Sequence, residues 1–174
     1  LLRSLNDNLP IFILALAFEP IIVGLYAMAS RLIKAPVQVM GEPVRIAYLQ
    51  RLAELVKTNS AINVSLFYLT LILFLLSLLI ILPLAFYGVD LFSWVLGDSW
   101  AKAGVYAAII APWFTSIFVQ VPSACVYIVF KKQQQLLFFQ GVASVLLLLA
   151  TGANFYFQLT VNEFLVLFSL LGTL

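Results

Sequence analysis

The sequence predicts an all-α membrane protein, a polytopic bundle of helices in a lipid bilayer. Hydrophobic residues make up 64% of the 174 residues, charged residues make up 9%, and the mean hydropathy is +1.14. A soluble domain has about 25% charged residues, so this chain has too few charges to cover a water-facing surface. Residues 66–86 and 136–150 consist almost entirely of apolar residues, as membrane-spanning helices do. Basic residues recur in alternate connections, which is typical of polytopic proteins.

We expect one domain, a six-helix lobe that covers residues 1–174. Its helices are predicted at residues 1–18, 20–44, 61–87, 101–130, 135–157 and 161–174. The third and fifth are the most apolar and should face lipid, whereas the first two carry polar residues and are candidates to line a pathway. The residues after Glu163 would reach about 16 Å, against a hydrocarbon core of about 30 Å. The sixth helix is therefore expected to be truncated, and the chain to be a piece of a longer protein.

The predicted connections differ in charge between the two sides of the bundle. One side carries Arg3, Arg45, Arg51, Lys57, Lys131 and Lys132, with Glu54 as its acid. The other side carries Glu19, Asp90, Asp98 and Glu163, with Lys102 as its base. By the positive-inside rule the basic side faces the cytoplasm. The tryptophan-containing stretch 91–100 is expected to lie along the opposite membrane interface.

A polar stripe follows one face of the second predicted helix. It consists of Arg31, Lys34, Gln38, Glu42 and Arg45, spaced three, four, four and three positions apart. At about 100° per residue these side chains fall within about 80° of one another. A charge at membrane depth costs about 2.5–3.5 kcal/mol or more, so such residues normally face a protein interior or water.

Two interpretations of this stripe are open. Glu42 and Arg45 can be explained by their position near the membrane surface, but Arg31 lies near the middle of the predicted helix. Arg31, Lys34 and Gln38 are therefore the candidate substrate-binding residues. The planar guanidinium of arginine suits phosphate or diphosphate, and lysine supplies a compact charge.

Other polar residues are weaker candidates. Asp7, flanked by Asn6 and Asn8, is the candidate for coupling transport to an ion gradient, although it could simply pair with Arg3 four positions earlier. Ser116 and Gln120 belong to an uncharged stripe on the fourth predicted helix, together with Ser123 and Tyr127. In membranes such residues most often hydrogen-bond between helices.

Several function classes find no support in the sequence. There is no histidine, and the single cysteine, Cys125, lies in an apolar stretch typical of a packing residue. We see no Gly-rich phosphate loop, no nucleophile–base set and no cluster of metal ligands. We therefore expect no enzyme activity, no cofactor and no metal. A basic cluster or motif for nucleic acid is also missing, so no nucleic-acid partner is expected.

Four segments resemble oligosaccharide flippases of polysaccharide biosynthesis, in the multidrug/oligosaccharidyl-lipid/polysaccharide exporter superfamily. The segments are VGLYAMASRLIKAPVQVMGEPV (23–44), LNDNLPIFILALAFEP (5–20), VLGDSWAKAGVYAAIIAP (95–112) and KKQQQLLFFQG (131–141). In this order they are similar to the second and the first helix of the C-terminal lobe of that family, to a later segment, and to the loop that follows it.

The resemblance implies a transporter of twelve to fourteen helices in two lobes, of which this chain would be the C-terminal one. The first two helices of each lobe would line a central cavity, where cationic residues meet the diphosphate of a lipid-linked oligosaccharide. The implied function is to flip that undecaprenyl-diphosphate-linked oligosaccharide from the cytoplasmic to the periplasmic leaflet of the bacterial inner membrane, by alternating access. The implied partners are this substrate, the bilayer and the missing N-terminal lobe.

Two other functions stay open at this point. A multidrug or cation antiporter of the same superfamily is one, although a cationic stripe argues against cationic drugs as substrates. A membrane scaffold or assembly subunit without transport activity is the other, and a bundle without a charged stripe would favour it.

Overall fold

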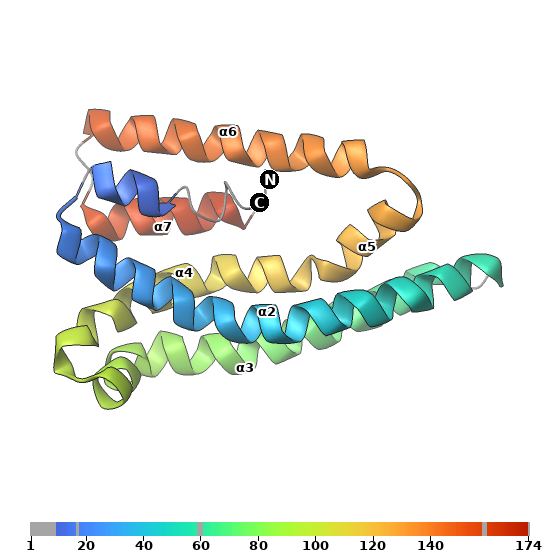
Figure 1. The fold of residues 1–174 in the computed structure, drawn as a ribbon, viewed down its shortest axis with the longest axis horizontal. Helices are drawn as coiled ribbons and strands as arrows, with labels where there is room; N and C mark the ends of the chain where they lie inside the picture. Colours follow the sequence, from blue (N-terminus) through green and yellow to red (C-terminus); the bar gives the residue numbers. More distant parts are fainter. Residues whose placement is uncertain (1–9, 17, 59–60, 158–159, 174) are drawn as a thin grey trace.

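The described part of the chain is all-helical (Figure 1). The computed structural model describes residues 10–16, 18–58, 61–157 and 160–173, and it has no strand among them. After a helical stretch at 10–16, the elements are α2 (Pro20–Lys57), α3 (Ile62–Leu96), the 3-10 helix η1 (Asp98–Trp100), α4 (Ala101–Val119), α5 (Val121–Val129), α6 (Gln133–Phe157) and α7 (Val161–Gly172). The predicted fold class is thus confirmed at the level of an all-α protein.

Three helical stretches of the described chain are long and apolar enough to cross a membrane. They are Pro20–Lys57, Ile62–Leu96 and Asp98–Val129, and the last contains η1, α4 and α5. The apolar helix α7 is shorter, with 12 residues. These three stretches indicate a membrane protein, whereas six spanning segments were expected from the sequence.

Helix α2 is longer than predicted, because residues 45–57 continue it instead of forming a connection. Tyr48, Leu52 and Leu55 recur at helical spacing and are buried, so the segment has an apolar face that packs although its other face is charged. At about 1.5 Å per residue, the 38 residues of α2 are about 57 Å long. The helix therefore exceeds a hydrocarbon core of about 30 Å, and some of its length must lie outside it.

Helix α3 also extends beyond its predicted end. Tyr87, the expected last residue, has non-helical backbone angles (φ −126°, ψ 16°) and marks a kink, after which the helix resumes to Leu96. Gly97 then ends it with a positive φ of 95°, a conformation that glycine adopts without steric penalty. The stretch 91–96 is thus part of α3, and its place along the membrane interface stays a prediction.

The predicted helix 101–130 is divided into α4 and α5 at Gln120. Pro122 lacks an N–H group, and its ring is incompatible with a regular helix through the preceding turn. The backbone N–H of Gln120 still donates to the carbonyl oxygen of Ser116 at 2.9 Å, and that of Ala124 donates to Gln120 at 3.0 Å. The chain therefore keeps the helical hydrogen bonds of Gln120 and Ala124 on either side of Pro122, although Pro122 itself donates none.

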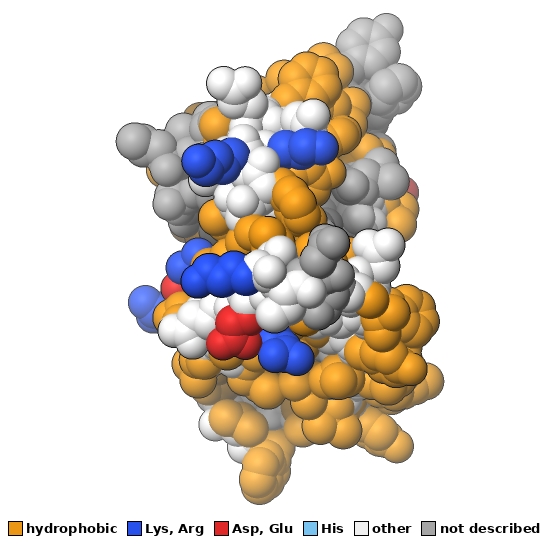
Figure 2. Space-filling view, turned by 90° about the vertical axis from the view of Figure 1, so that its right-hand side faces the viewer, with side chains coloured by type: hydrophobic (Ala, Val, Ile, Leu, Met, Phe, Trp, Pro, Cys, Tyr) orange, Lys and Arg blue, Asp and Glu red, His pale blue; other side chains and the backbone are white. Residues whose placement is uncertain are grey.

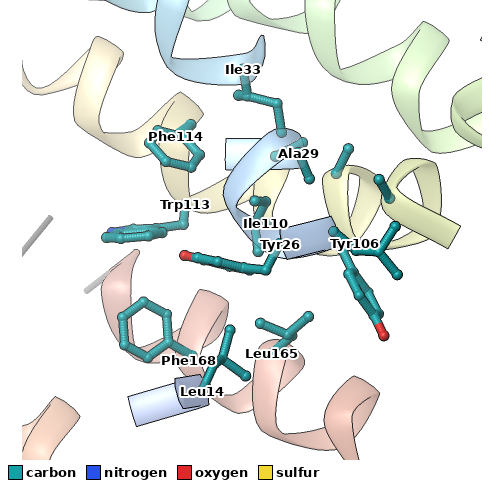
Figure 3. Packing of buried hydrophobic residues seen from close by; sticks show 14 of the residues in the cluster. Leu14, Tyr26, Ala29, Ile33, Tyr106, Ile110, Trp113, Phe114, Leu165 and Phe168 are labelled. Carbon is teal, nitrogen blue, oxygen red and sulfur yellow. The ribbon is translucent and has the colours of Figure 1, made fainter. Parts of the chain in front are cut away.

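Helix α4 is at the centre of the main hydrophobic core. It contacts α2, α3 and α7, and its buried side chains include Ile110, Trp113 and Phe114. Figure 3 shows Tyr26 of α2 between side chains of α4 and α7, with Phe168 on the α7 side. In contrast, α3 leaves most of its apolar side chains exposed, and that it faces lipid stays a prediction.

Candidate functional site: a polar groove between α2 and α4

A groove between α2 and α4 brings most of the polar stripe together. It has a volume of about 230 Å³. Its α2 wall consists of Lys34, Val37, Gln38, Gly41, Glu42 and Arg45, and Phe114, Ile117 and Val121 face them from α4 and α5. Four of the five stripe residues, which share a helix face, therefore line one groove.

The backbone of α2 approaches α4 closely at the base of this groove. Gly41 is buried, and a Cβ atom added there would lie 3.7 Å from the ring of Phe118. The larger polar side chains before and after it, Gln38 and Glu42, are exposed. The groove is thus polar on the α2 side and apolar on the α4 side.

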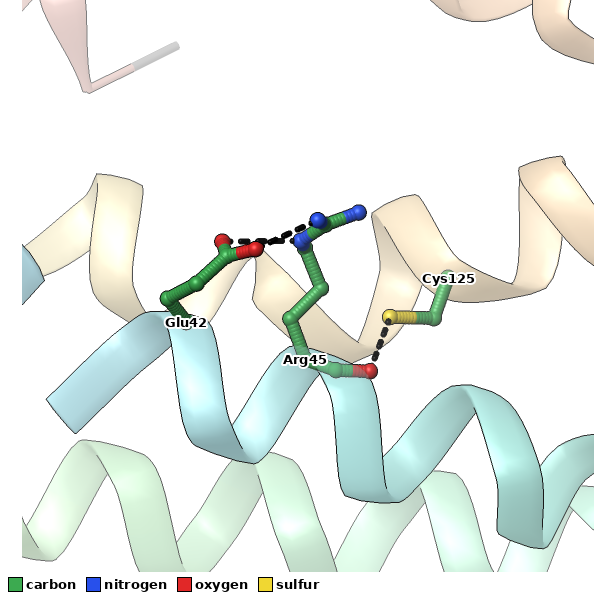
Figure 4. A network of polar contacts seen from close by, with 3 residues as sticks. All are labelled: Glu42, Arg45 and Cys125. Carbon is green, nitrogen blue, oxygen red and sulfur yellow. Dashed lines mark hydrogen bonds and ion pairs between the residues drawn. The ribbon is translucent and has the colours of Figure 1, made fainter.

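An ion pair forms one part of the α2 wall. The guanidinium of Arg45 donates to Glu42 through Nε, at 3.0 Å from Oε2, and through Nη2, at 2.6 Å from Oε1. Figure 4 shows both side chains on the same side of α2, next to α5. Their side chains are 38% and 58% exposed, and exposed pairs contribute about 0–1 kcal/mol. The pair therefore orients Arg45 and offsets its charge more than it stabilises the fold.

Lys34 supplies positive charge elsewhere in the groove. Its Nζ atom lies 5.8 Å from the centroid of the Phe114 ring, within the range of a cation–π interaction. This contact holds an ammonium group over an apolar wall, and Gln38 follows one helical turn later with an amide donor and acceptor. The lining residues carry two basic groups and one acidic group, so the groove favours an anionic or polar ligand over a cationic one.

The backbone of Arg45 is also fixed from the opposite helix. The thiol of Cys125 lies 3.8 Å from the carbonyl oxygen of Arg45 (Figure 4). Cys125 is fully buried and packs in a small core with Tyr48 and Leu52. This position agrees with the expectation of a packing residue, and it holds α5 against α2 just beyond the groove.

Arg31 is not among the lining residues of this groove, although it lies on the same helix face one turn before Lys34. Its side chain is exposed. Within the described chain Arg31 thus faces outward, at a place where lipid or a further part of the protein would meet it.

The remaining candidates do not belong to the groove. Ser116 is half-buried, and its hydroxyl donates to the carbonyl oxygen of Trp113 at 2.8 Å within its own helix. Gln120 is exposed at the junction of α4 and α5. Asn6, Asp7 and Asn8 lie outside the described residues.

No local pattern in the sequence marks the opposite wall of the groove. Phe114, Ile117 and Val121 look like any other apolar residues of a membrane helix, and their role depends on how α4 and α5 pack against α2. The i,i+3 spacing of Glu42 and Arg45 was a signal for their ion pair.

Metal ligands do not gather in the described chain. No group of three or more His, Cys, Asp or Glu residues is close enough to hold an ion there. The two cations of the groove, Lys34 and Arg45, can donate hydrogen bonds to an anion, and its carboxylate, Glu42, is paired with Arg45.

Comparison with known proteins finds no relative: no family model, no curated protein and no solved structure matches this chain.

Proposed function

We propose that this chain is one lobe of a membrane flippase for lipid-linked oligosaccharides. The proposal rests on the resemblance of four segments to that family and on the α2–α4 groove, where four stripe residues meet. The substrate would be an undecaprenyl-diphosphate-linked oligosaccharide, and the membrane would be the bacterial inner membrane, with the basic end of the bundle in the cytoplasm.

The groove suits a headgroup rather than a whole glycan. Its volume of about 230 Å³ is below the range of about 300–1,000 Å³ typical of pockets for drug-sized ligands. A diphosphate offers several oxygen acceptors, and charge-assisted hydrogen bonds to such groups are about twice as strong as neutral ones. Lys34 and Gln38 would contact the diphosphate, while the sugars would extend toward an N-terminal lobe and the lipid tail would stay in the bilayer.

Arg31 keeps a role in this proposal as a contact outside the groove. It lies on the same face of α2 as Lys34 and is exposed. In a two-lobe transporter, an exposed cation on a pathway helix would face the cavity between the lobes. The guanidinium would then meet the substrate as it passes between the leaflets by alternating access. Asp7 remains the candidate for coupling.

The second candidate is a multidrug antiporter of the same superfamily. It would need an acidic contact for cationic drugs, and Glu42 is the acid that lines the groove. Because Glu42 is engaged by Arg45, this observation favours an anionic substrate.

Complementation of a flippase-deficient strain with the full-length protein tests the proposed function. Arg31→Ala and Lys34→Ala should each strongly reduce display of the surface glycan at matched expression, because each removes a cation from the path of the diphosphate. Arg31→Lys should restore display only in part, since the charge remains but the planar fork does not. Lys102→Ala, which removes an exposed cation at the opposite end, is the matched control. Wild-type display by both alanine variants would refute the proposal.

A further inference from the structure

The end of the bundle where α2 stops and α5 turns into α6 is basic. Arg45, Arg51, Lys57, Lys131 and Lys132 lie toward this end, accompanied by the acids Glu42 and Glu54. Figure 2, which views the molecule from this end, shows blue side chains in two groups, with red ones beside the lower group. The charges therefore concentrate on one tip of an apolar bundle.

Two ion pairs neutralise part of this charge and leave three lysines. Arg45 pairs with Glu42 at 2.6 Å, and Arg51 pairs with Glu54 at 3.3 Å. Lys57, Lys131 and Lys132 are exposed, and none of the three is ion-paired with another described residue. The described end thus has a net positive charge that comes from these lysines.

A tight turn fixes two of the lysines side by side. The backbone N–H of Lys131 donates to the carbonyl oxygen of Ile128 at 3.1 Å, and that of Lys132 donates to Tyr127 at 2.9 Å. Lys131 has a positive φ of 55°, which reverses the chain immediately after α5. Both lysines therefore project from a hydrogen-bonded turn between α5 and α6.

Exposed apolar side chains begin close to these lysines. On α6, Phe138 and Phe139 are 68% and 59% exposed, and Phe138 is six residues, or about 9 Å along the helix, from Lys132. On α3, Phe67 is 63% exposed. An ammonium group with an exposed apolar surface immediately behind it matches the order of phosphate and acyl chain in a phospholipid.

The opposite end of the bundle carries more acidic than basic residues. Glu19, Asp90, Asp98 and Glu163 lie there, with Lys102 as the base among the described residues. The two ends of one apolar bundle therefore differ in the headgroup they can attract. A soluble polyanion would not need the adjoining apolar surface, whereas a lipid uses both.

We propose that the basic end is a binding surface for anionic phospholipids, with Lys57, Lys131 and Lys132 in contact with the headgroup phosphates. Each lysine near an anionic membrane surface raises the affinity of the protein for that surface about fivefold. The surface would hold the bundle at a fixed depth in a leaflet rich in phosphatidylglycerol or a similar lipid. This inference depends on the charge and the apolar surface alone, so it is independent of the substrate proposed above.

Lipid selectivity of the purified chain tests the proposal. Spin-labelled phosphatidylglycerol and phosphatidylcholine are compared for association with the protein in mixed-lipid bilayers. The wild type should prefer phosphatidylglycerol, and the preference should shrink between about 0.05 M and about 0.5 M salt, because the Debye length falls several-fold. The variant Lys57→Gln/Lys131→Gln/Lys132→Gln should lose most of the preference.

Two further variants separate charge from folding. Replacement of the same three lysines by arginine should keep the preference, because the charge is retained. Lys102→Gln, at the acidic end, should leave it unchanged. Full preference in the triple glutamine variant, or equal association of the two lipids with the wild type, would overturn the proposal.

Discussion

Gly88 and Gly104 bring the backbones of α3 and α4 into direct contact. A Cβ atom added at Gly88 would lie 2.8 Å from the carbonyl oxygen of Gly104, and one added at Gly104 would meet the carbonyl group of Gly88. Both glycines are buried. Small residues at helix crossings let membrane helices approach closely and gain van der Waals contact. This crossing lies one residue after the kink of α3 at Tyr87.

Substitution of Gly104 by alanine should separate α3 from α4. The added methyl group meets backbone atoms, which cannot move aside as a flexible side chain can, so we expect a loss of about 1–3 kcal/mol, as for an overpacked core. Thermal unfolding of the chain in detergent measures this loss of stability. Gly24→Ala is the control, because nothing lies within 4 Å of a Cβ atom there. Equal unfolding temperatures for the two variants would contradict this packing.

The start of α7 should respond to acid through its capping box. The hydroxyl of Thr160 accepts from the backbone N–H of Glu163, and the Glu163 carboxylate accepts from the backbone N–H of Thr160 at 2.9 Å. This backbone hydrogen bond, with a second one from the Thr160 hydroxyl, lowers the pKa of Glu163, which lies outside the three candidate spans.

A carboxyl group whose pKa is lowered by folding stabilises the fold at every pH above the ordinary glutamate pKa of about 4.3. That contribution is lost as the pH falls through the lower pKa of the folded state. Wild type should therefore unfold at a higher temperature than Glu163→Gln at pH 7, and the difference should vanish in strong acid. A difference that persists or grows in acid would refute the assignment. Asp90→Asn, at an exposed position of α3, controls for general charge effects.

The sequence predicts the features of this fold that depend on local helical geometry, but not those that depend on contacts between distant segments. The spacing of Lys34, Gln38, Glu42 and Arg45 predicted a shared helix face, because helical geometry is local. The continuation of α2 through residues 45–57 was missed, because five charged or amide side chains there resemble a connection. What decides in favour of the helix is the burial of Leu52 and Leu55, a tertiary effect.

The opposite wall of the groove shows the same limit. Phe114 lies under the ammonium group of Lys34, eighty positions away in the sequence, and no local pattern marks it. Arg31 shares a face with Lys34, yet it is exposed and lies outside the groove. Helix periodicity predicts which residues share a face but not where the neighbouring helix leaves space.

Glu42→Gln should distinguish an anionic substrate from a cationic drug. It removes the carboxylate that pairs with Arg45, so the positive charge of the groove rises, while the free energy of unfolding changes by only about 0–1 kcal/mol for so exposed a pair. Binding of a lipid diphosphate to the full-length protein should become tighter, by isothermal titration or fluorescence. Weaker diphosphate binding together with loss of binding of a cationic dye would favour the multidrug alternative.

The two ends of the bundle should lie on opposite sides of the membrane. Cysteines introduced at Lys57 or Lys132 should be shielded from a membrane-impermeant thiol reagent added to intact cells, and a cysteine at Asp98 should react. Native Cys125 is buried and gives a low background. Ready labelling at position 57 or 132 would reverse the proposed topology, and permeabilised cells control for access.

The central claim is tested most directly by asking whether the substrate protects a cysteine introduced at Gln38 from a thiol reagent. Gln38 is exposed and lines the groove between Lys34 and Glu42, so a cysteine at this position should react with a water-soluble thiol reagent in the full-length protein. Undecaprenyl diphosphate should slow that reaction several-fold, while a cysteine at Asp90, exposed on α3 at the acidic end of the bundle, should react at the same rate with and without the lipid. An unchanged rate at position 38 under saturating lipid diphosphate would contradict the assignment of this groove to the substrate.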